Sequence, residues 1–389
     1  MRIVDIRQRT FPLNVAIANA AISFDDMTAS VVAVVTDVVR NGKPVVGYGF
    51  DSVGRYGHGG LLAERFAPRV LAAEPGSLLD GSGRNLDPDK VWAAAMRNEK
   101  PAGHGERSGA VGLLDTAVWD AVAKIEDRPL WRVLHQRYGR GPAPTAVPVY
   151  GSGGHYRPDG NVASLADEVR AMLGLGYVRV KIKAGGAPLA EDRRRIEAVL
   201  KVLPRPDRLA LDLNGALAPA VAEAFLDAVA PYGLGWVEEP APPLDFVTSA
   251  RLAERYPHPL ATGENLFAAD EARNLLRYGG LRPDRDLLQF DIALAYGIAE
   301  YRRIVAVVEA AGWSRTRLYP HAGHAFALHV VGGLGLGCAE AGADQSKLFG
   351  GFPAGVTIAD GRASLPDTPG IGFERKANLF AVAAGLVDG

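Results

Sequence analysis

Short apolar runs that end in an ionisable residue recur along the second half of the chain at a nearly constant interval. The first run, YVRVKIK, ends at Lys183 and alternates apolar and basic residues with the two-residue period of a β-strand. Taken alone, it is typical of an edge strand with one solvated face. Five further runs end at ionisable residues spaced 26 to 30 positions apart: Asp212, Glu238, Glu264, Asp291 and His321. One strand and its crossover helix occupy about 30 residues, so this spacing predicts a parallel barrel whose strand ends bring the side chains to one face.

The length of the chain predicts a second domain beside the barrel. Its 389 residues exceed the roughly 250 of a plain eight-fold barrel. Residues 1–138 predict a small α+β domain with three strands, an Asn41–Gly42 hairpin turn, and a helix over 109–125 that buries a single apolar stripe. We place the barrel at 139–355 and expect residues 356–389 to return and complete the first domain. The charged run 191–195 (EDRRR) is expected to form the solvated outer face of a barrel helix.

Charge and cysteine content limit the kinds of partner. The formal net charge of −1 offers no basic footprint for nucleic acid or for a membrane surface. Cys338 is the single cysteine, so no internal disulfide can form. The first ten residues mix charges with apolar residues, unlike a secretory signal peptide, and no apolar run reaches the length of a membrane span. A cytoplasmic protein that acts on small molecules is the expectation.

The three strand ends that follow Lys183 along the chain all carry carboxylates. In a mostly apolar barrel mouth, Asp212, Glu238 and Glu264 would repel one another and raise one another's pKa values. A divalent cation would offset this repulsion, and an all-oxygen ligand set without cysteine or histidine favours Mg²⁺, with Mn²⁺ also possible. The alternative is that these acids form buried ion pairs with nearby lysines.

A base and an acid are predicted on either side of this metal, because four strand ends lie between Lys183 and His321. Lys181 points the same way as Lys183, and the like charge together with the cation would lower the lysine pKa enough to make a base. Asp291, one strand before His321, can accept a hydrogen bond from one ring nitrogen and set the tautomer. The pattern predicts that Lys183 removes a proton next to a carboxylate, that the metal stabilises the enediolate, and that His321 acts as general acid. A structural role is the alternative for the histidine.

Together these residues form a set of motifs that resembles one known family over nearly the whole chain. The motifs are Lys181-Ile-Lys183, Asp212-Leu-Asn214, Glu238-Glu239-Pro240, Gly263-Glu264-Asn265, Asp291 and His321, with the segment AVWDAVAKIEDRPLWRVL at 117–134. They resemble the mandelate racemase group of the enolase superfamily, which uses a lysine or histidine base with Mg²⁺. The resemblance implies an α+β capping domain over a modified (β/α)₈ barrel of the form (β/α)₇β, with Asp212, Glu238 and Glu264 as metal ligands.

Within that group the segments RNEKPAGHGERS, TGENLF, RPDRDLLQFD, PHAGH and GGFPAGV look most like the D-tartrate dehydratases. This resemblance implies Mg²⁺-dependent conversion of D-tartrate to oxaloacetate. Lys183 would abstract the proton α to a carboxylate, His321 would protonate the departing hydroxyl, and the enol product would tautomerise. The implied substrate contacts are Lys181, Asn214, Lys100, Glu340 and Asn19, and the alternative for Lys100 is an ordinary surface lysine.

The base, acid and metal are common to several activities, so the sequence leaves the substrate open. The alternatives are a dehydratase of a longer aldonate or aldarate, a 2-hydroxy-acid racemase, and a barrel that kept metal binding but lost catalysis. A small hydroxycarboxylic acid is the expected substrate, and a homo-oligomer is expected. The covering loops Asn19–Met27 and Ser52–Gly60 would decide specificity, whereas His58, His104 and His324 have no predicted role.

Overall fold

The computed structural model describes the whole chain except residues 52–57, 324, 343, 345–346, 349 and 388–389. At one end lies an antiparallel sheet in the order β1-β2-β3, formed by β1 (Ile3–Pro12), β2 (Thr28–Arg40) and β3 (Lys43–Phe50). Asn41 and Gly42 both have positive φ, 50° and 75°, as the tight turn of a two-residue hairpin requires. The segments between this sheet and the barrel are α1 (His58–Leu61), η1 (Leu62–Phe66), α2 (Ala67–Leu71), η2 (Pro75–Leu78), α3 (Pro88–Ala95), α4 (Arg107–Ile125) and α5 (Leu130–Tyr138).

Helix α4 lies between this sheet and the barrel. On one side a Cβ added at Gly47 of β3 would lie 2.0 Å from the Ala117 carbonyl oxygen, and on the other a Cβ at Gly112 would lie 1.7 Å from the Ala293 oxygen. Every residue from Ser108 to Ala123 is buried. The prediction of a single buried stripe was therefore wrong: the helix is covered on all sides, because it fills the space between the two parts of the molecule.

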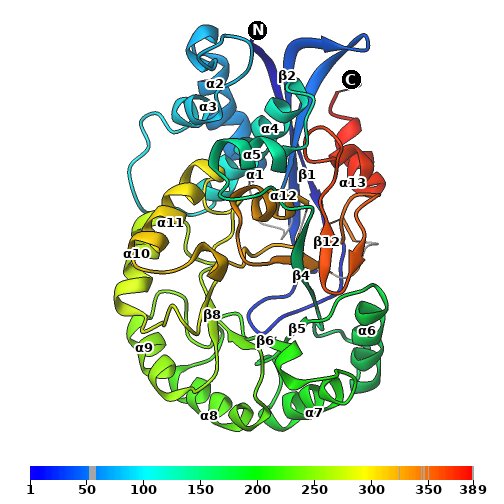
Figure 1. Cartoon of the computed structure of the whole chain (residues 1–389), viewed down its shortest axis with the longest axis vertical. Coiled ribbons are helices and arrows are strands. Elements are labelled where there is room, and N and C mark those ends of the chain that lie inside the picture. The colour runs from blue at the N-terminus through cyan, green and yellow to red at the C-terminus, as the bar shows by residue number, and fades with distance from the viewer. Residues whose placement is uncertain (52–57, 324, 343, 345–346, 349, 388–389) are drawn as a thin grey trace.

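The second part is a ring of parallel strands surrounded by helices (Figure 1). Neighbouring strands pair in chain order from β4 to β9, and β10 pairs with β4. Leu318 closes the remaining gap, since it bridges in parallel to Leu288 and its carbonyl accepts from Gly337 N at 3.0 Å. The strands are β4 (Ala146–Gly153), β5 (Val180–Lys183), β6 (Leu209–Asp212), β7 (Trp236–Glu238), β8 (Leu260–Thr262), β9 (Leu287–Leu288) and β10 (Ala339–Gly342).

The crossover helices lie on the outside of the ring. They are α6 (Val162–Gly174), α7 (Leu189–Leu200), α8 (Pro219–Val229), α9 (Phe246–Arg255), α10 (Ala269–Tyr278), α11 (Ile298–Ala310) and α12 (Ala325–Leu334), with the 3₁₀ turns η3 (Pro206–Arg208), η4 (Ala230–Tyr232) and η5 (Arg315–Arg317). All but the last helix bury part of their surface against the ring, whereas α12 is buried from Phe326 to Leu334. The run 191–195 in α7 was expected to be solvated throughout, and this is only partly correct. Glu191, Arg193 and Arg194 are exposed, but Asp192 and Arg195 are buried. The reason is that these two side chains point back toward the ends of β4 and β5.

The end of the chain returns across both parts. Strands β11 (Ile358–Ala359) and β12 (Arg362–Ser364) extend the barrel sheet, with β12 antiparallel to β4. After η6 (Phe373–Arg375), helix α13 (Ala377–Ala384) packs its Leu379 and Ala383 on the antiparallel sheet. Where one domain ends and the other begins stays a prediction, because this last segment contacts the two in turn.

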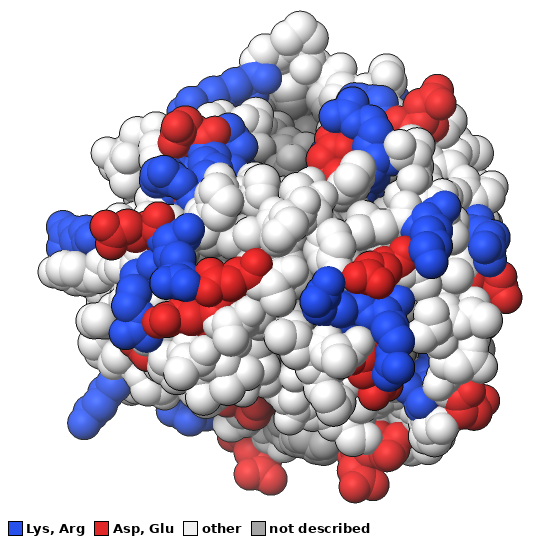
Figure 2. Space-filling model, turned by 90° about the horizontal axis from the view of Figure 1, so that it is seen from below, with Lys and Arg blue, Asp and Glu red and all other residues white. Residues whose placement is uncertain are grey.

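The surface is mixed in charge. On the face shown in Figure 2, basic and acidic side chains lie interspersed rather than gathered by sign, as the net charge near zero leads one to expect. Among the helices that the structure describes, none combines the length and the apolar character needed to span a bilayer.

Candidate active site

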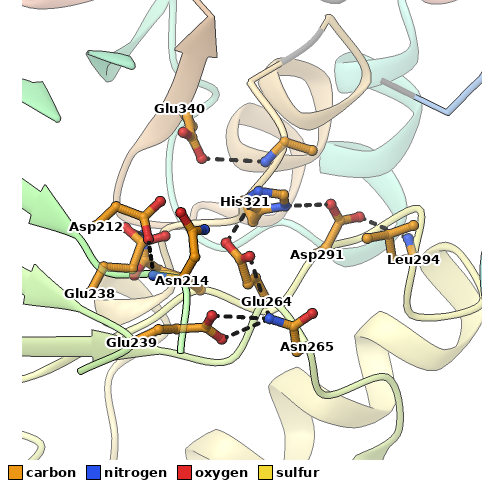
Figure 3. A network of polar contacts seen from close by, with 12 residues as sticks. Asp212, Asn214, Glu238, Glu239, Glu264, Asn265, Asp291, Leu294, His321 and Glu340 are labelled. Atoms are coloured by element: carbon orange, nitrogen blue, oxygen red, sulfur yellow. Dashed lines mark hydrogen bonds and ion pairs between the residues drawn. The ribbon is translucent and has the colours of Figure 1, made fainter. Parts of the chain in front are cut away.

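Three buried carboxylates meet at the mouth of the barrel (Figure 3). Asp212 ends β6, Glu238 ends β7, and Glu264 follows β8 by two residues. One oxygen from each lies within 4.8 Å of the other two. The parallel register places Lys183 beside Asp212 and Asp212 beside Glu238. Gly263, with φ of 129°, turns the chain so that Glu264 joins them, in a conformation that side chains other than glycine rarely adopt.

The charges of this cluster fit a divalent cation. Burial and the neighbouring charge of Asp212 raise the pKa of Glu238 to about 8. The set offers only oxygen ligands, and Asn214 Oδ1 beside it is buried without a hydrogen bond. A cation would lower the cost of holding three carboxylates together in an apolar surrounding, and oxygen ligands are those that Mg²⁺ prefers. The residues present therefore fit the predicted metal site.

The alternative of buried ion pairs is also seen, because both lysines contact the same carboxylates. Lys181 Nζ lies 2.8 Å from Glu238 Oε1 and 3.1 Å from Glu340 Oε1, and it is completely buried beneath the cluster. Lys183 Nζ lies 2.5 Å from Asp212 Oδ2. Burial lowers the pKa of Lys183, but Asp212 and the other carboxylates outweigh burial and raise it overall. The expected lowering combined the like charge of Lys181 with the charge of a cation. Among the protein groups, Lys181 does lower the pKa of Lys183, but the carboxylates outweigh it.

His321 contacts the opposite end of the carboxylate row. Its Nδ1 lies 2.9 Å from Asp291 Oδ2, and its Nε2 lies 3.2 Å from Glu264 Oε2. Asp291 is itself held by the Leu294 N–H, which donates to its Oδ1 at 2.8 Å. Burial lowers the pKa of His321, but Glu264 and Asp291 raise it overall to about 10. The ring is therefore a cation here and can donate a proton from Nε2.

A cavity of about 250 Å³ lies over this cluster. From the loop that follows β1 it is lined by Asn19, Ile22 and Phe24, and Asn19 is itself held by Ala21 N and Ile22 N, which donate to its Oδ1 at 2.8 Å. The predicted residues that line it from the barrel are Lys183, Asn214, Glu264, His321 and Glu340.

Two predicted substrate contacts lie elsewhere. Lys181 is buried below the carboxylates and does not line the cavity. Lys100 is exposed and lines a separate surface hollow with His104 and Arg107. His58 is buried between Asp51 and Glu106, and His324 and most of the loop from Ser52 to Gly60 lie outside the described residues.

Sequence reasoning missed several polar residues that line the cavity, among them Ser152, His155 and Lys347. His155 follows β4 by two residues, so the same rule of strand ends that found Lys183 could have found it. Burial, with the charge of Lys183, lowers the pKa of His155 to about 3, so this ring is neutral. Lys347 lies in a loop without a periodic pattern, and no sequence signal points to it.

Comparison with known proteins now gives the family. A family model described as enolase C-terminal domain-like matches residues 164–378, more than half of the chain. The chain belongs to the enolase superfamily. The predicted fold class, an α+β cap over a (β/α)₇β-type barrel, is confirmed by this match together with the solved structures that the whole chain resembles.

Three relatives are informative. The chain is 29% identical over 328 residues to 3,6-anhydro-α-L-galactonate cycloisomerase of Streptomyces coelicolor, covering 83% of this chain and 85% of the relative. It is 25% identical to arabinonate dehydratase of Saccharolobus solfataricus, covering 75% and 76%. The crystal structure of L-talarate dehydratase from Polaromonas sp. JS666, complexed with Mg and L-glucarate, has a TM-score of 0.75 and 25% identity and covers 97% of this chain and 95% of its own. All three names are those of sugar-acid enzymes, and none is D-tartrate dehydratase.

Proposed function

We propose that this protein is a Mg²⁺-dependent acid-sugar dehydratase of the enolase superfamily, whose substrate is an aldonate or aldarate longer than tartrate. The observation that carries the proposal is the order of groups across the barrel mouth. Lys183 contacts Asp212 at one end of the carboxylate row, and His321 contacts Glu264 at the other. A substrate bound over the row would have a base on one face and an acid on the other.

In this proposal Lys183 takes the proton from the carbon next to the substrate carboxylate, and it must be a neutral amine to do so. A cation held by Asp212 would neutralise the carboxylate that now raises the lysine pKa and would favour loss of the lysine proton to solvent. The electron pair left behind expels the hydroxyl from the adjacent carbon, and His321 Nε2 gives that oxygen a proton so that it leaves as water. Asp291 stabilises the imidazolium and keeps Nε2 directed at the cavity. The enol that remains tautomerises to a 2-keto acid.

Asp212, Glu238 and Glu264 would hold the metal. Mg²⁺ bound there would supply positive charge opposite the substrate carboxylate. Lys181, beneath the row, balances part of the negative charge of Glu238 and Glu340 and so keeps the cluster compact. Beyond these groups, the cavity wall offers Asn19, Ser152, His155 and Asn265 as hydrogen-bonding partners for hydroxyls. This supply of polar groups, together with the names of the relatives, supports a polyhydroxy acid.

The decisive experiment is turnover of a panel of sugar acids with Mg²⁺, read out as 2-keto acid formed. The panel contains D-tartrate, five- and six-carbon aldonates and six-carbon aldarates. We expect turnover of at least one five- or six-carbon acid, well above that of D-tartrate. Turnover of D-tartrate alone would instead favour the shorter substrate, and a complete lack of 2-keto acid with every member would contradict the dehydratase.

A racemase is the second candidate, because a base and an acid on opposite faces could also exchange one proton for another at the same carbon. Incubation in D₂O separates the two. A racemase would place deuterium in a recovered 2-hydroxy acid of inverted configuration without loss of hydroxyl. A dehydratase releases the keto acid.

A further inference from the structure

One arginine of helix α7, Arg195, donates hydrogen bonds to the main chain of Lys183, the proposed base. Arg195 Nη1 donates to the carbonyl oxygen of Lys183 at 3.2 Å, and Nη2 donates to that of Gly154 at 2.7 Å. Gly154 follows β4 and Lys183 ends β5, so a single guanidinium joins the ends of two neighbouring strands. Asp192, one helical turn earlier, accepts from Nη1 at 3.1 Å. Both side chains are buried, although they belong to the charged run 191–195.

Asp192 and Tyr156 also bind the main chain of the turn that follows Lys183. The Gly185 N–H donates to Asp192 Oδ2 at 2.7 Å, and the Gly186 N–H donates to the Tyr156 hydroxyl at 3.0 Å. That hydroxyl in turn donates to Asp192 Oδ1 at 2.7 Å. A Cβ at Gly186 would lie 2.6 Å from Tyr156 Cε2, which is why glycine is needed here. The tyrosine ring also lies 4.0 Å from the Arg195 guanidinium carbon.

Tyr156 connects this cluster to the loop over the cavity. Its main chain exchanges two hydrogen bonds of 2.9 Å with Ala18, the residue before Asn19. The loop after β1, the end of β4 and the end of β5 are therefore joined through one set of contacts. A displacement of Arg195 would therefore displace both Lys183 and the loop that forms the cavity wall.

We propose that Arg195, held by Asp192 and Tyr156, is a positioning residue that keeps the Lys183 amine in line with the substrate. The proposal rests on the function proposed above, with Lys183 as the base. A buried ion pair contributes little net stability compared with apolar packing, but it defines a geometry. The contacts here go to the carbonyl of the base residue itself. Because a misplacement of about 1 Å can cost about 100-fold in rate, small errors at this position should appear in catalysis.

The test compares two neighbouring arginines. Arg195→Lys keeps the charge and removes the fork that reaches two carbonyls, whereas Arg194→Lys changes the adjacent exposed arginine in the same way. For both variants and wild type we would measure Tm, Mg²⁺ affinity, kcat, KM, and the isotope effect with substrate deuterated at the α-carbon. We expect Arg195→Lys to lower kcat by about 10- to 100-fold, leave KM within about twofold, and raise the isotope effect. Arg194→Lys should match wild type.

The proposal is overturned if Arg195→Lys has a kcat within about twofold of Arg194→Lys. It is also overturned if the fall in turnover matches the loss of folded, Mg²⁺-binding protein, so that kcat per folded molecule is unchanged. If Arg195→Lys does not fold, Tyr156→Phe decides, because it keeps the ring and removes only the hydroxyl: the same fall in kcat and rise in isotope effect support the proposal, and wild-type values overturn it. Failure of the proposed function looks different, since wild type itself would then turn over no sugar acid.

Discussion

Two buried histidines show how differently this protein treats polar groups in two of its regions. At the barrel mouth, His321 lies among Glu264, Asp291 and Glu340, and their charges raise its pKa to about 10. At the seam where α5, α12 and the returning end of the chain meet, burial lowers the pKa of His329 to about 4. There Nδ1 accepts from Trp131 N at 3.0 Å, and Nε2 donates to Ile371 O at 3.1 Å.

The difference between the two histidines indicates which region serves catalysis and which serves stability. At the seam His329 is neutral, and one ring nitrogen has a hydrogen-bond donor as its partner while the other has an acceptor. At the mouth, the buried carboxylates outnumber the lysines and the histidine that pair with them. Such an excess of buried charge lowers the stability of the fold and is typical of functional sites. Changes at the mouth should therefore affect turnover far more than folding, and changes at the seam should do the reverse.

The largest effect is expected for Lys183→Ala. Removing the proposed base should lower kcat by about 10³- to 10⁴-fold, because general base catalysis alone contributes up to that order. Mg²⁺ binding, measured by calorimetry, should persist because the three carboxylates remain. Lys201→Ala, at an exposed lysine after α7, is the control and should keep wild-type turnover. Activity that survives in Lys183→Ala would mean that the base is a different group.

The next effect concerns pH and the seam. His329 has a folded pKa of about 4, below the roughly 6.5 of a free histidine. Above pH 6.5 it is neutral in both states and contributes no pH dependence. As the pH falls from 6.5 to 4 the unfolded chain binds a proton that the folded chain refuses, so stability should fall by a few kcal/mol, at about 1.4 kcal/mol per pKa unit. The folded chain does not bind the proton because a proton on Nδ1 would face the Trp131 N–H, which already donates to that nitrogen.

The measurement is the free energy of unfolding by urea at several pH values for wild type and His329→Gln. The variant cannot take up a proton, so it should lose this part of the acid sensitivity. The advantage of wild type over the variant should therefore shrink between pH 6.5 and 4. A difference that stays constant with pH would contradict the neutral histidine.

The smallest effect is expected for Gly333→Ala, also at the seam. A Cβ there would lie 2.4 Å from Leu134 Cβ and 3.1 Å from Trp131 O, which forces α5 and α12 apart. Overpacking of this kind costs about 1–3 kcal/mol, more than the roughly 1 kcal/mol that alanine gains in a helix. Tm should fall while kcat per folded molecule stays unchanged. Gly174→Ala in α6, where a Cβ meets nothing within 4 Å, should leave Tm unchanged or raise it.

The sequence alone determined the order of the strands and the residues at their ends. The interval of 26 to 30 residues follows from the length of one strand and one helix. It placed Lys183, Asp212 and Glu238 correctly at strand ends, whereas Glu264 and Asp291 lie a short way beyond theirs. The chemistry of carboxylates with a lysine and a histidine then indicated the metal and the proton transfer. These inferences need only local pattern and the convergence of parallel strands.

The tertiary structure decided what local pattern cannot express. Asp192 and Arg195 read as a solvated face, and α4 reads as a helix with one apolar stripe, until their surroundings are known. The placement of Lys100 away from the cavity, and of His155 and Lys347 within it, depends on how loops lie over the barrel. Burial and the net charge around a group are sums over residues far apart in the chain. For that reason the same side chain, histidine, is a cation at the mouth and neutral at the seam.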